Sequence, residues 1–417
     1  MPLRINPNLA GLRCSLTGKP VDDRGYSRPI GLCSCCPPPG RPVVAGYDGE
    51  KVRAELGARP LATREAPGIL AFEPLLPVTG LAASYAGDVG RTPVLRNDRL
   101  SGELDAEVFV KSEAANPSGS FKDRGLAVGV AFGVACGARR FCLPTQGNAG
   151  VAACLFSARA GLPGTLIYMP EGFAGGVYHR ACEHFGGEVR FFGANIAAAG
   201  RRMREDVREE LARGELVDIS TFFEPGRLEG KKTMGLEIEM AFGGRALPEF
   251  VVYPTGGGTG LVGIWKAFAE LAAMGLLDPA HRRLPRMVAV QSEQCAPVVE
   301  SFLAGRDAVT PVTSRGTIAD GLDVPAAIMG HGMLRVLRES GGTAVAVSEA
   351  EIRAAFARFG AAGIAAGYES AATLAALARL RRDGTAPEGA SALLLATGSH
   401  LIPLGAGHTA HAGEPRT

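Results

Sequence analysis

The residue types with the clearest chemistry lie in a turn-rich segment, residues 116–125, which reads Asn-Pro-Ser-Gly-Ser-Phe-Lys-Asp-Arg-Gly. The segment runs into an expected helix, so Lys122 falls in the first helical turn. Helix N-termini carry partial positive charge, which eases loss of the lysine proton. A neutral lysine amine is the nucleophile that a Schiff base requires. Lys122 is therefore a candidate catalytic residue, with an ordinary surface lysine as the alternative.

Two further loops have residue types that bind anions. Residues 145–150, Thr-Gln-Gly-Asn-Ala-Gly, connect an expected strand to a helix, and backbone N–H groups in such a loop suit a carboxylate. Residues 255–260, Thr-Gly-Gly-Gly-Thr-Gly, precede another expected helix and suit a phosphate. The second loop lacks the Gly-Lys-Ser/Thr of a Walker motif and is too compact for the Rossmann fingerprint. We expect a cofactor phosphate there; plain strand-to-helix turns are the alternative for both loops.

These loops depend on the elements around them, and from about residue 105 short apolar runs alternate with helical patterns. The expected strands are residues 107–110, 140–144, 165–169, 188–192, 250–253, 286–290 and 392–396. The expected helices are residues 121–138, 149–160, 178–185, 198–213 and 261–274. This alternation predicts an α/β fold with parallel sheets, whose strand ends face a common crevice. From the end of the last strand, the hydroxyl of Thr397 can reach a ligand nitrogen.

Composition narrows the class of protein. The chain has 417 residues, of which 46% are hydrophobic, and its net charge is +2. This charge balance gives no support for a nucleic-acid-binding surface, and no apolar stretch reaches the ~18 residues that a membrane helix needs. The start of the chain lacks the apolar core of a signal peptide. Together with cysteines scattered through apolar segments, this predicts reduced thiols and a cytoplasmic protein.

Four further cysteines, Cys14, Cys33, Cys35 and Cys36, lie near the N-terminus. A zinc ribbon uses two Cys-x₂-Cys pairs. Cys33 and Cys36 could form one pair, but Cys14 is followed by Ser-Leu-Thr and lacks its partner. The spacing favours a small packed appendage without a metal, and zinc at Cys14, Cys33 and Cys36 is the alternative.

The order and types of these segments resemble the fold-type II enzymes that use pyridoxal phosphate, the tryptophan synthase β family, and within it the threonine synthases. Residues 90–94, Gly-Arg-Thr-Pro-Val, resemble an early turn of the family, and residues 120–125 match its cofactor-lysine segment. Residues 229–233 and 321–325 resemble two more of its motifs. The resemblance implies pyridoxal 5′-phosphate as the cofactor and two parallel-sheet α/β domains with the active site between them.

The resemblance also implies roles for individual residues. Lys122 would hold the cofactor covalently and transfer protons, Asn148 would contact its ring oxygen, and Thr397 would face its pyridine nitrogen. The cofactor phosphate would bind Gly256, Gly257, Gly258, Thr259 and Gly260. The α-carboxylate of the substrate would bind the loop that contains Thr145, Gln146, Gly147 and Ala149. The leaving phosphate would bind Arg227, with Lys231 or Lys232 and Asn116, because a basic cluster suits a dianion. Ser120 would also contact the substrate.

The implied reaction is elimination of phosphate from O-phospho-L-homoserine, followed by addition of water to give L-threonine. Glu224 and Asp323 differ in charge from the family pattern at these positions. They leave open a β-replacement synthase that acts on an activated serine, as a cysteate or cysteine synthase does. A serine or threonine dehydratase and a non-catalytic binding protein are the remaining alternatives.

We predict five segments along the chain. Residues 1–50 form a ribbon-like appendage, residues 51–125 and 215–405 form a larger cofactor-binding domain, residues 126–214 form a smaller domain, and residues 406–417 are a tail. The resemblance implies a homodimer that takes a small amino-acid substrate, without nucleic acid or membrane as a partner.

Overall fold

The computed structural model describes residues 2–21, 26, 30–57, 61 and 65–399. The predicted tail, residues 406–417, lies outside these residues. None of the helices within the described ranges combines the length and the apolar character needed to span a membrane.

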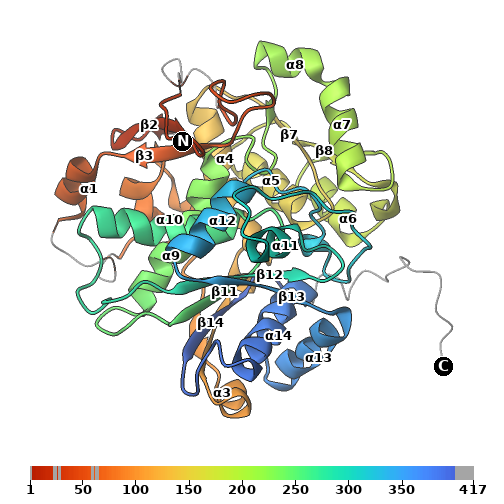
Figure 1. Cartoon of the computed structure of the whole chain (residues 1–417). Coiled ribbons are helices and arrows are strands. Elements are labelled where there is room, and N and C mark those ends of the chain that lie inside the picture. The colour runs from red at the N-terminus through yellow and green to blue at the C-terminus, as the bar shows by residue number, and fades with distance from the viewer. Residues whose placement is uncertain (1, 22–25, 27–29, 58–60, 62–64, 400–417) are drawn as a thin grey trace.

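A six-stranded sheet has the strand order β13-β12-β11-β14-β6-β5 (Figure 1). Its strands are β5 (Val94–Arg96), β6 (Glu107–Ser112), β11 (Phe250–Pro254), β12 (Arg286–Ser292), β13 (Thr343–Val347) and β14 (Ser391–Ala396). Neighbouring strands are parallel, except that β5 pairs with β6 in the antiparallel sense. The predicted parallel α/β class is therefore confirmed, with β5 as an antiparallel edge that the apolar pattern did not indicate.

Alternate residues of this sheet face two helical layers (Figure 1). Val108 and Val110 point into one core, which is shared with α3 (Asp98–Leu104), α13 (Glu349–Ala361) and α14 (Tyr368–Arg382). Phe109 and Val251 point into the other core, which is shared with α9 (Gly226–Ala241), α10 (Thr259–Ala273), α11 (Pro297–Leu303) and α12 (Gly330–Glu339). A parallel sheet covered on both faces directs its strand ends, rather than its faces, toward ligands.

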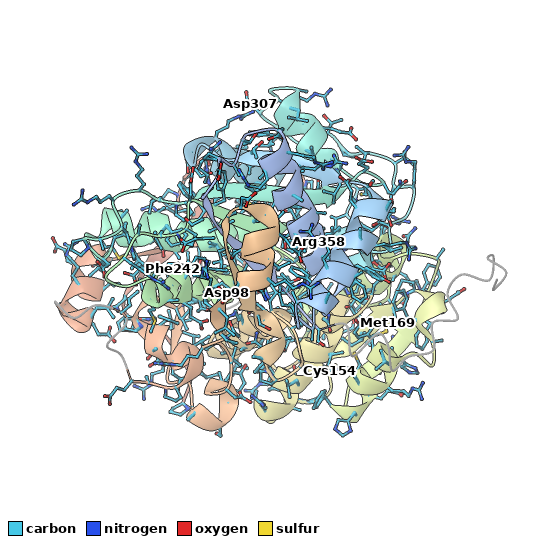
Figure 2. All side chains as sticks on the ribbon, turned by 90° about the horizontal axis from the view of Figure 1, so that it is seen from below. Asp98, Cys154, Met169, Phe242, Asp307 and Arg358 are labelled. Atoms are coloured by element: carbon cyan, nitrogen blue, oxygen red, sulfur yellow. The ribbon has the colours of Figure 1, made fainter. Side chains whose placement is uncertain are left out.

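A smaller, fully parallel sheet has the order β10-β7-β8-β9. It consists of β7 (Phe141–Pro144), β8 (Leu166–Met169), β9 (Glu188–Phe191) and β10 (Val217–Asp218), and its first core includes α4 (Lys122–Ala135), α5 (Asn148–Arg159) and α6 (Val177–His184). Seen from below, Cys154 and Met169 of this core lie in one half of the molecule and Phe242 of the larger core lies in the other (Figure 2).

The charged helix expected over residues 198–213 is two helices, α7 (Ile196–Asp206) and α8 (Arg208–Arg213). Val207 separates them with φ −111° and ψ 23°, outside helical geometry, and its side chain is buried in the second core of the smaller sheet. Burial of this side chain accompanies the break, which the charge pattern alone did not indicate.

The N-terminal segment is joined to the rest of the chain by strand pairing and side-chain contacts. β1 (Arg4–Ile5) pairs with β4 (Val78–Thr79), and β2 (Leu9–Cys14) pairs with β3 (Val43–Tyr47), both antiparallel. The hydroxyl of Tyr47 donates to Glu229 on α9 at 3.0 Å. The boundaries that we predict for the domains and the appendage stay a prediction.

Helices α4 and α9 touch through glycines. A Cβ atom on Gly230 of α9 would lie 1.9 Å from the carbonyl oxygen of Arg124, and one on Gly125 of α4 would lie 3.0 Å from the carbonyl oxygen of Arg227. The two backbones are therefore in contact, and this contact brings the start of α4, with Lys122, next to the first turns of α9.

Replacing Gly230 with alanine is expected to lower the free energy of unfolding by about 1–3 kcal/mol, because a methyl group between the two backbones overpacks the contact. Gly102→Ala in α3 is the matched control, since no atom of the described residues lies within 4 Å of its added Cβ. A helical alanine there should stabilise the protein by up to about 1 kcal/mol. Urea denaturation of the two variants measures the difference, and equal stabilities would contradict the close helix contact.

Candidate active site

The segment that carries Lys122 lies against the end of β14. The Phe121 N–H donates to the Thr397 carbonyl oxygen at 2.9 Å, and Ser120 forms an antiparallel bridge with Gly398. β14 and β6 are parallel neighbours, so the loops that follow them leave the same edge of the sheet. The strand order thus brings the segment that contains Ser120 and Lys122 next to Thr397.

Lys122 is the first residue of α4 and is partly buried. Burial and, secondarily, the positive charge of Arg227 lower the pKa of its amine to about 8, although the carboxylate of Glu369 acts in the opposite direction. Burial is thus the main cause of the easier deprotonation, which the sequence analysis attributed to the helix N-terminus. At this pKa, a substantial fraction of the amine is neutral near physiological pH.

Two nitrogen donors on α9 accompany this amine. Lys231 donates to the carbonyl oxygen of Phe121 and lies 3.6 Å from the centre of the Phe121 ring. Burial, followed by the charges of Lys122 and Arg227, holds the pKa of Lys231 well below its usual range. Arg227 donates to the Ile219 carbonyl oxygen at 2.8 Å, but its Nε has no hydrogen-bond partner among the described residues. An unpaired buried donor suits an anionic ligand.

Glu224, one of the residues that differ in charge from the family pattern, is buried at the start of α9. Its carboxylate accepts the N–H groups of Gly226 at 2.5 Å and Arg227 at 2.7 Å. Burial raises the pKa of Glu224 to about 7, against the lowering effect of Arg227. Its oxygens are therefore bonded to the first backbone groups of α9, in addition to the attraction between Glu224 and Arg227.

Lys232 and Asn116 are bonded in the structure to residues other than Lys122, Arg227 and Lys231. Consecutive helical residues point about 100° apart, so Lys232 leaves α9 in another direction, and its amine lies 2.7 Å from Glu229 and 2.8 Å from Glu270. The Asn116 amide donates to a Glu113 oxygen at 3.0 Å, and its own oxygen accepts the Gly90 N–H at 2.9 Å. The sequence analysis grouped these residues with the substrate site because spacing alone does not fix direction.

A buried network of charged side chains lies at the N-terminal end of α4. The Arg124 guanidinium is 2.6 Å from Glu113 and 2.6 Å from Glu237, and the Lys111 amine is 2.7 Å from Glu237. All four side chains are buried. The network ties β6, α4 and α9 together, so it fixes the direction in which α4 starts.

The loop over residues 145–149 begins α5. Thr145 Oγ1 accepts the N–H groups of Gly147 at 3.1 Å and Gly150 at 3.2 Å, while Gln146 and Ala149 lie in the same turn. The Asn148 side chain bonds Tyr178, but its Oδ1 is buried without a partner among the described residues. An amide with an unsatisfied end fits a polar atom of a bound molecule.

The glycine-rich loop joins β11 to α10, as expected. Gly258 is left-handed, with φ +81°, and a Cβ there would lie 2.1 Å from Met333 Sδ. Cβ atoms at Gly256 and Gly260 would lie 2.1 Å from the Gly321 carbonyl oxygen and 2.0 Å from the Tyr253 hydroxyl. These three glycines therefore meet neighbouring protein, whereas the sequence analysis explained them by the cofactor alone. The loop and Thr259 still present backbone N–H groups at the start of a 15-residue helix.

Three residues that line this region were not among the predicted site residues. Glu369 acts on the pKa of Lys122, and its Oε1 accepts the Gly321 N–H at 2.9 Å. Tyr178 packs against Gly147, where a Cβ would lie 3.1 Å from the ring. Ser370 Oγ accepts the Thr397 N–H at 3.0 Å. Glu369 and Ser370 lie in the first turn of α14, the helix that precedes the last strand, and this position could have indicated that they lie near the site. No local motif marks Tyr178 as a site residue.

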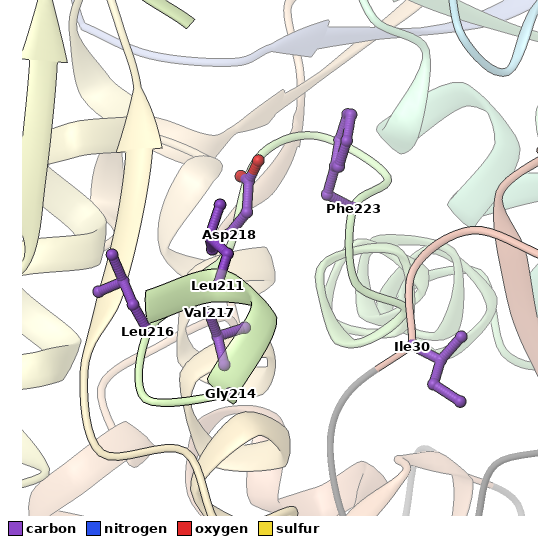
Figure 3. A pocket seen from close by; sticks show the side chains of 7 residues that line it. All are labelled: Ile30, Leu211, Gly214, Leu216, Val217, Asp218 and Phe223. Carbon is purple, nitrogen blue, oxygen red and sulfur yellow. The ribbon is translucent and has the colours of Figure 1, made fainter. Parts of the chain in front are cut away.

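A separate cavity of about 230 Å³ lies between the N-terminal segment and the smaller sheet (Figure 3). Its lining consists of Ile30, Leu211, Gly214, Leu216, Val217, Asp218 and Phe223. Because none of the predicted site residues lines it, we do not assign it to the cofactor.

The residues around Lys122 fit pyridoxal phosphate, because they combine a deprotonatable amine, an unsatisfied Asn148 amide and a glycine-rich helix start. A family model described as "Pyridoxal-phosphate dependent enzyme" matches residues 85–398. The threonine synthase of Methanosarcina acetivorans is 31% identical over 385 residues, which cover 90% of this chain and 89% of that protein. The chain belongs to the threonine synthase family. Pyridoxal 5′-phosphate is its cofactor.

Further comparisons agree with the threonine synthase family and the fold-type II architecture. The threonine synthase of Methanocaldococcus jannaschii is 29% identical and aligns with 93% of this chain and 92% of that protein. Maize serine racemase superposes with a TM-score of 0.63 at 20% identity, covering 74% of this chain and 88% of that one. An O-ureido-L-serine synthase superposes with a TM-score of 0.62 at 23% identity, covering 78% and 94%. The predicted family, fold class and cofactor are confirmed.

Covalent attachment of the cofactor is expected to accelerate as pH rises through about 8, because the neutral amine of Lys122 is the nucleophile. Arg227→Met removes a positive charge that lowers this pKa, so the midpoint should move to higher pH. The measurement is the rate of visible absorbance change when cofactor-free protein is mixed with pyridoxal phosphate. Comparison of the two proteins cancels the titration of the cofactor itself, and an identical midpoint would contradict the role of Arg227.

Proposed function

We propose that this member of the threonine synthase family converts O-phospho-L-homoserine and water into L-threonine and phosphate. The observation that carries the proposal is the placement of Arg227 and Lys231 on α9 beside Lys122 on α4. A base next to two nitrogen donors, one of which is the Arg227 guanidinium, suits a substrate that loses a proton from carbon and releases a phosphate dianion.

The cofactor, when bound, supplies an electron sink for carbanions of the substrate. We assign its phosphate to the backbone N–H groups of residues 256–260 at the start of α10. We assign its ring oxygen to the Asn148 amide and its ring nitrogen to the Thr397 hydroxyl. The buried Asn148 Oδ1, which has no partner among the described residues, can accept a hydrogen bond from the ring oxygen in its hydroxyl form, and the position of Thr397 beside Phe121 supports the second assignment.

The remaining residues act on the substrate. The N–H groups at the start of α5, residues 145–149, bind its α-carboxylate. Lys122 Nζ, which attaches the cofactor, then accepts the proton from the substrate α-carbon. Arg227 Nε and Lys231 Nζ bind the leaving phosphate, and arrival of this dianion raises the pKa of Lys231, so the lysine takes up a proton.

The test is incubation of the holoenzyme with O-phosphohomoserine at saturating cofactor. Threonine and phosphate should appear in equal amounts. The matched arms are O-phosphoserine with sulfide or sulfite, which detect a β-replacement synthase, and serine or threonine alone, which detect a dehydratase through keto-acid release. Absence of threonine would overturn the proposal, and inactivity in every arm would indicate the non-catalytic alternative.

Glu224 and Asp323 motivated the β-replacement alternative, and the position of Glu224 weakens the part of that motive that rests on Glu224. Its carboxylate is bonded to the backbone of α9 and is attracted to Arg227, as described above, so it does not oppose a phosphate with an uncompensated charge. We further propose the predicted homodimer, the cytoplasmic location and the predicted domain division. Sedimentation of the purified holoenzyme tests the dimer.

A further inference from the structure

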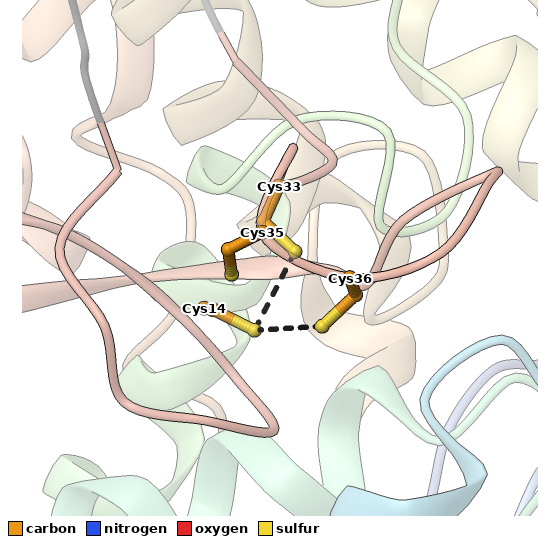
Figure 4. A group of neighbouring side chains, drawn as sticks. All are labelled: Cys14, Cys33, Cys35 and Cys36. Carbon is orange, nitrogen blue, oxygen red and sulfur yellow. Dashed lines mark hydrogen bonds between the residues drawn. The ribbon is translucent and has the colours of Figure 1, made fainter.

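Four thiol groups converge in the N-terminal segment. Cys14 Sγ lies 3.5 Å from Cys33 Sγ and 3.7 Å from Cys36 Sγ, and the sulfurs of these three residues and Cys35 all lie within 4.8 Å of one another. Figure 4 shows the four side chains turned toward a common point. The remaining five cysteines, which are Cys136, Cys142, Cys154, Cys182 and Cys295, are buried elsewhere in the chain.

The backbone explains how the four thiols meet. Cys14 ends β2, and Cys33, Cys35 and Cys36 lie in the loop that returns to β3, the antiparallel partner of β2. The Cys33 N–H donates to the Arg41 carbonyl oxygen at 2.8 Å, which closes this loop. Cys33 and Cys36 have the spacing of one zinc knuckle, and Cys35 supplies the partner that Cys14 lacks in the sequence. Cys35 therefore completes the four-sulfur ligand set that the sequence spacing left incomplete.

We propose that Cys14, Cys33, Cys35 and Cys36 bind a structural zinc ion. Tetrahedral zinc holds each sulfur at about 2.3 Å, which places the sulfurs about 3.8 Å apart. The two separations from Cys14 Sγ, 3.5 and 3.7 Å, are close to this edge and the other pairs lie within 4.8 Å, whereas a disulfide requires about 2.05 Å. Binding replaces the thiol protons with the metal, so protons are released as Zn²⁺ enters.

Two of the four sulfurs each accept a hydrogen bond from a backbone N–H group. The Thr17 N–H donates to Cys14 Sγ at 3.5 Å, and the Arg41 N–H donates to Cys33 Sγ at 3.4 Å. Hydrogen bonds of this kind orient metal ligands and stabilise their negative charge. Cys14 and Cys33 are buried and Cys35 is exposed, so the cluster has both an ordered base and a side open to solvent.

The same loop also supports the glycine-rich loop at residues 256–260. Ser15 follows Cys14; its Oγ lies 3.0 Å from His331 Nε2, and its carbonyl oxygen accepts from Arg335 at 3.2 Å. His331 and Arg335 lie on α12, whose Met333 packs against Gly258. A metal at the four cysteines would therefore stabilise, through α12, the loop to which we assign the cofactor phosphate.

The test begins with the metal content of purified holoenzyme, measured by inductively coupled plasma mass spectrometry. We expect about one zinc per chain, and X-ray absorption should show four sulfur neighbours at about 2.3 Å. Cys14→Ser and Cys36→Ser should reduce bound zinc at least tenfold. Cys142→Ala, which removes a buried thiol of β7, is the matched control and should retain it.

The proposal is overturned if the wild-type protein contains less than about 0.2 zinc per chain after expression with added zinc. It is also overturned if zinc persists in both serine variants, because the metal then lies elsewhere. The zinc readout does not depend on catalysis, so it is independent of the threonine assay. A weaker affinity for pyridoxal phosphate in the serine variants, by several-fold, would support the link through α12, and unchanged affinity would contradict that link.

Discussion

Replacing Lys122 with alanine is expected to abolish covalent attachment of pyridoxal phosphate and to reduce turnover by at least about 10²–10⁴-fold, the usual contribution of a positioned acid–base group. Lys122 follows Phe121, whose N–H bonds the Thr397 carbonyl oxygen, and burial and Arg227 bring the pKa of its amine to about 8. Alanine removes both the attachment point and the base, while the segment around residue 122 keeps its backbone bonds to β14.

Reduction of the holoenzyme with borohydride followed by peptide mapping checks this prediction. The pyridoxyl label should appear on Lys122 in the wild type and should be absent from Lys122→Ala. Lys231→Met is the matched control, because Lys231 is a buried lysine of the same region whose amine is bonded to the Phe121 carbonyl oxygen. The label should remain in this variant, and a label on Lys231 in the wild type would show that the wrong lysine had been assigned.

Replacing Arg124 with alanine is expected to lower the free energy of unfolding by about 3–5 kcal/mol. The guanidinium bonds Glu113 and Glu237, all three side chains are buried, and Lys111 would be left as the nearby cation for two carboxylates. The matched control is Arg99→Ala, whose partner Glu103 lies 3.0 Å away in an exposed pair. That substitution should cost less than about 1 kcal/mol.

Urea denaturation over a range of pH sharpens the same prediction. Burial alone would raise the pKa of Glu237, but the charges of Arg124 and Lys111 outweigh it and lower this pKa to about 2. The carboxylate therefore stabilises the fold above its ordinary pKa near 4.5, and this contribution is lost as pH falls from about 4.5 toward 2. Arg124→Ala should show a smaller loss over this interval. An equal slope in both proteins would contradict the charge network.

The sequence predicted helices and strands well where the pattern of apolar residues within one short segment determines the structure. The apolar runs at residues 107–110, 250–253 and 392–396 correspond to β6, β11 and β14, because strands buried on both faces have near-continuous apolar sequences. The expected helix over residues 121–138 corresponds to α4 and starts at Lys122. β13 and the antiparallel β5 were missed: β5 has three residues, two of them exposed, and three of the five residues of β13 are only half-buried.

The directions of side chains, and the contacts between residues that are distant in the sequence, were harder to predict. Lys231 and Lys232 are neighbours in sequence, yet one points toward Phe121 and the other bonds Glu229 and Glu270. Glu369 reaches the site from a helix far along the chain. In the cysteine loop, spacing was compared with a two-knuckle pattern, whereas the fold brings Cys35 across to Cys14. Each case depends on which elements face one another, and local spacing does not contain that information.

The position of β14 has a consequence for how the protein is made. This strand, residues 391–396, lies between β6 and β11, so the centre of the larger sheet comes from the last described strand of the chain. Chains leave the ribosome N-terminal end first, and until β14 emerges, β6 and β11 each lack this neighbour. The Phe121–Thr397 bond must wait for the same event. The lysine pocket is therefore completed only after β14 has been synthesised, which couples capture of the cofactor to the emergence of this strand.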